Sequence, residues 1–199
     1  ITAQTAPVVE ALYPQILDAL QSALTDRPFL LGQRPSQADM GFFGSMFRHF
    51  YSDPTGARIM RERAPRVRAW VERLWHLTPA AYSHLPHSAF IAGGLEPLRA
   101  ILCGDYLPYL RANEQAVEHG EKHVHWQSQG VRFTTPSSPY QRHCWQRLRA
   151  RFQGLQPPQQ QQVGDWLDDP AVSAMLQLSA PDACAKAPSS HKVLDQRWR

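Results

Sequence analysis

Residues 29–39 read FLLGQRPSQAD, and this stretch contains the clearest helix start in the chain. Ser36 stands three residues before Asp39, so its hydroxyl is placed to accept a hydrogen bond from the Asp39 amide. The Asp39 carboxylate can in turn accept one from the Ser36 amide, which makes the pair a capping box. Pro35 and Met40 occupy the two positions of a hydrophobic staple. We therefore predict a structural role for Ser36 and Asp39 and a helix that begins directly after Ser36.

The helix that this box opens runs through residues 40–50, MGFFGSMFRHF, and is apolar on almost every side. Such a helix is expected to be buried at the centre of a bundle. Gly41 and Gly44 lie three residues apart, a spacing that would let another helix approach closely. The sequence therefore predicts a central helix with neighbours on all of its faces.

Amphipathic segments flank this helix on both sides. Residues 9–24 carry an apolar stripe at helical spacing, interrupted by Pro14, which starts or kinks a helix. The dipeptides Asp53-Pro54 and Ala64-Pro65 each mark the start of a further helix. The second of these helices carries Trp70 on its apolar face. Residues 9–77 are thus expected to fold as a group of packed helices.

The order of these features between residues 20 and 74 resembles the C-terminal domain of the glutathione transferases. The matching elements are an amphipathic helix, FLLGQRPSQADMGFF, a short connector and APRVRAWVERL. In that family a Ser-x-x-Asp capping box opens the central helix, and Ser36 and Asp39 are the positions that match it. The resemblance implies an all-α fold, a helical bundle like the C-terminal domain of those enzymes.

The resemblance also implies what the chain contributes to a larger protein. In the family, a thioredoxin-like N-terminal domain binds glutathione and supplies the Tyr, Ser or Cys that activates its thiol, and residues 1–199 are not expected to contain it. The full-length relative would be a glutathione transferase that conjugates glutathione to an apolar electrophile or reduces one with it. Glutathione would be its co-substrate. This chain would form the substrate side, carry no catalytic residue, bind no cofactor by itself and be inactive alone.

The expected partners follow from the same resemblance: a glutathione-transferase-type N-terminal domain, a second copy in a homodimer and an apolar small molecule. The alternative is a non-catalytic protein-interaction domain, because some translation and trafficking factors use the same helical domain in that way. The sequence upstream of Ile1 would discriminate between these two functions.

The chain beyond residue 78 is longer than the usual family tail. Residues 95–118 read as a long helical segment with a bend at Gly104 or Pro108. Residues 122–127 and 131–134 alternate on either side of Gln129-Gly130, which predicts a β-hairpin. Helices are expected over residues 140–152, from 159 to 167 and from 170 to 178. We divide the chain into a helical domain (1–118), an extension with the hairpin (119–178) and a loose tail (179–199).

Aromatic residues of the central helix and its partner are candidates for an apolar ligand pocket, although at helical spacing such residues more often form the core. The most accessible position is the C-terminal end of the central helix. His49 and Tyr51 are therefore the predicted substrate-binding residues.

Histidine and cysteine residues are the candidate metal ligands of the chain. His119, His123 and His125 have a spacing that could hold a metal, but no fourth ligand stands near them in the sequence, so no metal site is expected. The three cysteines of the chain are far apart and form no CxxC pair, which suits a reducing compartment and a cytoplasmic location.

The charge balance bears on two further classes of partner. The formal net charge is +4 and the pI is about 9.2, and almost all of the positive charge is arginine. Because the arginines stand at helical spacing beside apolar residues, solvated helix faces explain them better than nucleic-acid binding. No apolar run approaches the roughly 20 residues that span a bilayer. Neither a nucleic acid nor a membrane is therefore expected as a partner.

Overall fold

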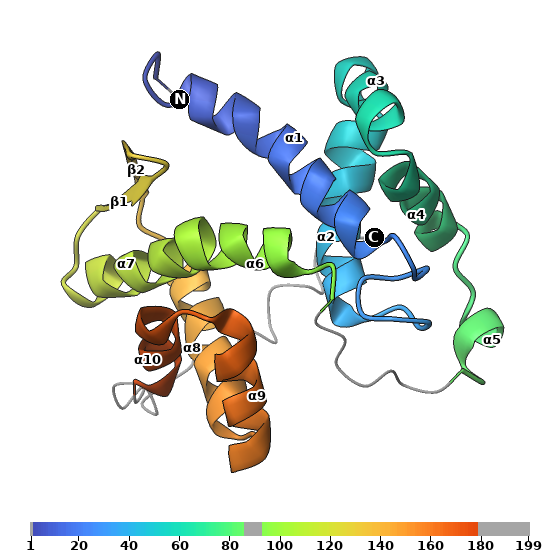
Figure 1. Cartoon of the computed structure of the whole chain (residues 1–199). Coiled ribbons are helices and arrows are strands. Elements are labelled where there is room, and N and C mark those ends of the chain that lie inside the picture. Colours follow the sequence, from blue (N-terminus) through green and yellow to red (C-terminus); the bar gives the residue numbers. More distant parts are fainter. Residues whose placement is uncertain (1, 86–92, 179–199) are drawn as a thin grey trace, which may run out of the picture.

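The computed structural model of the chain describes residues 2–85 and 93–178 (Figure 1). Helices dominate this part of the chain, and two strands form one small antiparallel sheet. The predicted fold class, an all-α bundle with a small hairpin in its C-terminal extension, is confirmed. The predicted tail, residues 179–199, lies outside the described residues, and the proposed division into three parts stays a prediction.

The first half of the molecule is a group of helices that begin at prolines or caps. Its elements are α1 (Ala6–Ala23), α2 (Gln37–Ser45), the π-helical turn η1 (Met46–Tyr51), α3 (Pro54–Arg63), α4 (Pro65–Trp75) and the short α5 (Pro79–Tyr82). Pro14 lies inside α1 and does not end it. The Asp53 side chain caps α3 by accepting from the amides of Thr55 and Gly56.

A first apolar core holds these helices together. Its fully buried members come from α1, the loop before α2, α3 and α4, and they include Leu17, Leu20, Phe29, Leu30, Met60, Val67, Trp70 and Val71. Trp70 is the largest of these side chains, and burial of each such side chain is worth about 1.5–3 kcal/mol. The core lies where α1 crosses α3 and α4.

The helix after the capping box differs from its prediction. The expectation that residues 40–50 are buried on all sides is wrong, because Met40 is 46% exposed and Asp39 is the only buried residue of α2. A Cβ added at Gly41 or Gly44 would meet nothing within 4 Å, so the described residues place no helix against these two glycines. Within residues 2–85 and 93–178, α3 and α4 pack against η1, while Met40, Gly41 and Gly44 of α2 are exposed.

The second half of the molecule contains the hairpin and a separate set of helices. Its elements are α6 (Glu96–Ile101), the π-helical turn η2 (Leu102–Tyr106), α7 (Leu107–Glu118), β1 (His123–Ser128), β2 (Val131–Pro136), α8 (Pro139–Gln153), α9 (Pro157–Leu167) and α10 (Pro170–Gln177). Ser128 pairs with Val131 across the turn. Gln129 and Gly130 both have positive φ, 50° and 77°, as a two-residue hairpin turn requires.

A second apolar core lies among α7, α8, α9 and α10, and its central residue is the fully buried Trp145. The long segment from α6 to α7 joins the two cores, since Leu98 belongs to the first and Leu107 and Leu110 to the second. Between them, η2 contains Gly104, one of the two predicted bend positions. A π-helical turn changes the number of residues per turn and so redirects the helix face between the two cores. Figure 1 shows α6 and α7 following one another along this line.

Candidate ligand-binding site

The carboxylate of Asp39 is fully buried and is surrounded by donors. One oxygen, Oδ2, accepts from the amide of Ser36 at 2.8 Å and from its hydroxyl at 2.6 Å, and the Ser36 hydroxyl oxygen accepts from the Asp39 amide at 3.4 Å. The other oxygen, Oδ1, accepts from the amide of Leu30 at 2.8 Å and from the indole nitrogen of Trp70 at 2.9 Å. Asp39 thus ties the loop before α2, the start of α2 and α4 together, and four donors occupy its two oxygens.

The loop that precedes the capping box is closed by a tight turn. The amide of Phe29 donates to the carbonyl of Gly32 and the amide of Gly32 donates back, both at 3.2 Å. Gly32 has a φ of 136°, a conformation that favours glycine. This turn holds Leu30 in place so that its amide points at Asp39.

The predicted binding residue Tyr51 is held by an ion pair between α4 residues. Its hydroxyl donates to Glu72 Oε1 at 2.9 Å, and Arg68 Nε donates to the same oxygen at 3.0 Å. The Arg68 guanidinium also lies 5.7 Å from the centre of the Tyr51 ring. The hydrogen bonds from Arg68 and then from Tyr51 lower the pKa of Glu72, so this carboxyl is ionised at neutral pH. Tyr51 is therefore fixed in position by its polar end.

Four aromatic rings form a cluster that we call the aromatic ledge, in which Phe43, Tyr51 and Trp75 each stack on the central ring of Phe47. Phe47 stacks on Phe43 at 5.5 Å and on Tyr51 at 5.9 Å, ring centre to ring centre. On α4, Trp75 stacks on Phe47 at 4.4 Å with an angle of 13° between the planes. Trp75 is 58% exposed, so the ledge presents an accessible indole.

The structure separates the two predicted binding residues. His49 lies on η1 between Phe47 and Tyr51, about half a turn from each, and is exposed. The exposed residue of the ledge is instead Trp75, an aromatic residue of α4 that is not among the predicted binding residues. Trp75 follows Val71 by four residues and so continues one edge of the apolar stripe of α4, and the spacing therefore gives no signal that Trp75 faces solvent.

The thiols of the described residues belong to the second half. Cys103 is buried, and desolvation, followed by the nearby charge of Asp169, raises the pKa of its thiol. A thiol with a raised pKa is protonated at neutral pH and is a poor nucleophile. Cys144 is half-buried and forms no disulfide with Cys103, and Cys184 lies outside the described residues.

The three candidate metal ligands lie at the hairpin. His123 and His125 are exposed on β1, the His125 ring nitrogen Nδ1 lies 2.8 Å from the hydroxyl of Thr134, and His119 lies 3.9 Å from Glu121. Within residues 2–85 and 93–178, no group of three or more His, Cys, Asp or Glu side chains is arranged to hold a metal ion.

A hollow of about 460 Å³ lies between α9 and α10, and its lining residues are far from those of the ledge in the sequence. Asp165, Asp168 and Asp169 line it together with glutamine side chains, and Phe152 contributes an apolar wall. Asp169 also caps α10 by accepting from the amides of Ala171 and Val172. Since three carboxylates line it, this hollow does not suit an apolar compound.

Comparison with known proteins identifies the first half of the molecule. Residues 4–73, about a third of the chain, match the family described as "Glutathione S-transferase, C-terminal domain". The segment that contains the capping box is therefore similar to the glutathione S-transferase C-terminal domain, and the family resemblance predicted from Ser36, Asp39 and the surrounding sequence is confirmed for these residues. The match ends within α4, just before the exposed indole of Trp75.

The other two comparisons returned nothing: no curated protein and no solved structure matches the chain. Among the described residues, no helix has the length and apolar character needed to cross a membrane.

Proposed function

We propose that this chain is the substrate side of a glutathione-transferase-like protein and that the aromatic ledge binds an apolar, planar part of the substrate. The observation that carries this proposal is the cluster of Phe43, Tyr51 and Trp75 around Phe47, in which the indole of Trp75 is exposed. An exposed indole that belongs to a cluster of stacked rings is suited to contact a further flat apolar group.

The polar groups beside the ledge support a binding role and not a chemical one. Asp39 and Ser36 satisfy one another and the backbone, and the hydroxyl of Tyr51 is held by Glu72. A tyrosine that activates the glutathione thiol would need its hydroxyl free to face that thiol. In the proposed protein, the thiol is accordingly activated by a thioredoxin-like domain outside residues 1–199.

The wider function follows from the family. The whole protein would use glutathione as co-substrate, act on apolar electrophiles in the cytoplasm and form a homodimer. A non-catalytic interaction domain is the second candidate. One observation favours it, namely the uncovered face of α2 with exposed Met40, Gly41 and Gly44.

The ledge can be tested by titrating the chain with the apolar dye 8-anilinonaphthalene-1-sulfonate. Replacing Trp75 or Tyr51 by Ala removes a stacked ring, so each variant should bind the dye about three- to tenfold more weakly. Val9→Ala is the matched control, because Val9 is also exposed and apolar but lies on α1. Unchanged dye binding in both ledge variants, with circular dichroism showing an intact fold, would reject the ledge as the binding site.

A further inference from the structure

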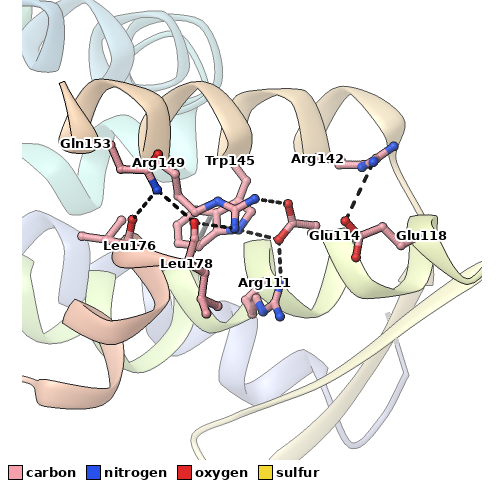
Figure 2. Close-up of polar contacts among 9 residues, drawn as sticks. All are labelled: Arg111, Glu114, Glu118, Arg142, Trp145, Arg149, Gln153, Leu176 and Leu178. Carbon is pink, nitrogen blue, oxygen red and sulfur yellow. Dashed lines mark hydrogen bonds and ion pairs between the residues drawn. The ribbon is translucent and has the colours of Figure 1, made fainter. Parts of the chain in front are cut away.

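The inner side of α8 is fixed by a buried ionic network, which Figure 2 shows. Glu114 of α7 accepts from Arg111 at 2.7 Å and from the indole nitrogen of Trp145 at 3.0 Å, and it forms an ion pair with Arg149. Glu114 and Arg149 are almost completely buried. Arg149 also lies over the ring of Trp145 at 5.5 Å. These contacts fix the rotation of α8 about its axis and leave its opposite side to solvent.

The outer side of α8 carries an apolar line. Tyr140, Cys144 and Leu148 follow one another at four-residue spacing, and Tyr140 and Leu148 are 71% and 40% exposed. From η2, Tyr106 joins this line with 44% of its surface exposed. Tyr106 is close to Cys144 and Tyr140, and burial of its hydroxyl, then proximity to these groups, raises its pKa.

A basic line runs beside the apolar one. The sequence of α8 contains four arginines and no Asp or Glu. Two of the arginines are neutralised: Arg142 lies 3.8 Å from Glu118, and Arg149 pairs with Glu114. The other two are exposed, and no carboxylate in residues 2–85 or 93–178 forms an ion pair with either. Arg151 contacts the neutral side chain of Gln37 at 3.2 Å, and Arg147 lies one turn before it.

We propose that this outer side of α8 is a docking surface for an acidic amphipathic helix of a partner protein. The apolar side of such a helix would cover Tyr140, Leu148 and Tyr106, while its carboxylates would meet Arg147 and Arg151. Arginine forks bind carboxylates through two parallel hydrogen bonds, and charge complementarity sets which partner is accepted. The surface from Tyr140 to Arg151 covers about three helical turns, roughly 16 Å, which matches a short helix laid along it.

The charge pattern favours a protein over a nucleic acid. In the described part of the chain, two arginines of α8 have no ion pair, and the carboxylate of Glu118 lies beside Arg142 at one end of the helix. Nucleic-acid binding draws on many phosphate contacts and a broad basic surface. An apolar line of tyrosines and a leucine flanked by two arginines matches instead the alternation of apolar and acidic residues on an amphipathic helix.

The test uses the whole 199-residue chain and a fluorescently labelled 14-residue peptide with leucines along one helix face and glutamates beside them. Fluorescence anisotropy should show binding that weakens at least tenfold in Arg147→Glu/Arg151→Glu and in Tyr140→Ser/Leu148→Ser. The matched control is Arg61→Glu/Arg66→Glu, which removes two exposed arginines from α3 and α4 and should change the affinity less than twofold. A scrambled peptide of the same composition should bind at least tenfold more weakly than the amphipathic one.

Several outcomes would overturn the proposal. These are no binding of the amphipathic peptide, equal binding of the scrambled peptide, or an equal loss in the control variant. Tighter binding of a single-stranded oligonucleotide or of phosphatidylserine vesicles through the same arginines would also replace it. If a variant fails to fold, a peptide with lysine in place of glutamate tests the unchanged chain, which should then not bind.

Discussion

Two buried carboxylates, one in each half of the molecule, are stabilised by different kinds of hydrogen-bond donor. Asp39 and Glu114 both have no exposed surface, and each accepts a hydrogen bond from the indole of a tryptophan 31 residues later, Trp70 and Trp145 respectively. Asp39 receives its other hydrogen bonds from two backbone amides and a hydroxyl at a helix start. Glu114 receives its others from two guanidinium groups.

This difference has energetic consequences. Neutral donors and a helix dipole stabilise Asp39 without burying a second charge. Around Glu114, burial of the carboxylate also requires burial of Arg149, and the pair gains its stability only while both members are present. The first half is therefore organised by local backbone geometry, and the second half depends on an ion pair between two helices.

The largest expected effect comes from breaking the buried pair. Replacing Glu114 by Ala leaves the guanidinium of Arg149 buried without a counter-charge, which should lower the free energy of unfolding by about 3–5 kcal/mol. Urea denaturation followed by circular dichroism measures this change. The double variant Glu114→Leu/Arg149→Met removes both charges and should be clearly more stable than Glu114→Ala. Equal instability of the two variants would show that the charge is not the cause.

Removing the other carboxylate should cost less. Asp39→Ala leaves the Leu30 amide and the Trp70 indole without an acceptor, and it removes the partner of Ser36 from the capping box. We expect a loss of about 2–3 kcal/mol, which is the cost of buried donors without partners. A thermal melt gives the change directly. A melting temperature equal to that of the unchanged chain would contradict the structural role of Asp39.

The two tryptophans allow a matched comparison of smaller effects. Trp70→Phe and Trp145→Phe each keep an aromatic ring and remove one donor to a carboxylate, at a cost of about 1–2 kcal/mol. Asp39 has no cation to replace the lost donor, whereas Glu114 keeps two. Urea denaturation should therefore show a larger loss for Trp70→Phe than for Trp145→Phe, and the reverse order would refute the proposed difference between the halves.

The smallest effect is expected at the surface pair of Arg63 and Asp18, which joins α3 to α1 at 2.5–2.7 Å with both side chains about half exposed. The hydrogen bond from Arg63 lowers the pKa of Asp18. Since the folded pKa is the lower one, the stabilisation is present above the unfolded pKa of about 4 and is lost as the pH falls through the folded value.

Melts of Asp18→Asn at several pH values measure this contribution. The variant should be slightly less stable than the unchanged chain at pH 7, and the difference should vanish in strong acid. A difference in stability between the two proteins that grows as the pH falls would contradict this prediction.

The same contrast explains which parts of the fold the sequence predicts. The capping box depends on Ser36 and Asp39 alone, and the hairpin on alternation around Gln129-Gly130, so both are readable from local pattern. The network of Glu114 and Arg149 joins residues 35 apart in the chain. In the sequence, Arg149 is one more arginine at helical spacing and reads as a solvated charge, whereas in the structure it is buried.

Less of the candidate site than of the fold could be predicted from the sequence, because the exposure of its residues is not a local property. Exposure of Met40 and Trp75 depends on which neighbours cover α2 and α4, and no local pattern contains that information. The sequence predicts that Tyr51 lies at the C-terminal end of the helix that the capping box opens. It did not show that a π-helical turn brings Tyr51 into line with Phe47 and turns His49 away from both.

We propose that residues 1–199 supply the substrate side of the protein and that the thiol chemistry lies elsewhere. The most direct measurement is a turnover assay of this chain with glutathione and a chromogenic electrophile, run on the same preparation that binds the apolar dye. We predict dye binding and a rate equal to that of the reaction without protein. Turnover clearly above that rate would show that the group that activates the thiol lies within this chain, and it would contradict the proposed division between substrate binding and thiol chemistry.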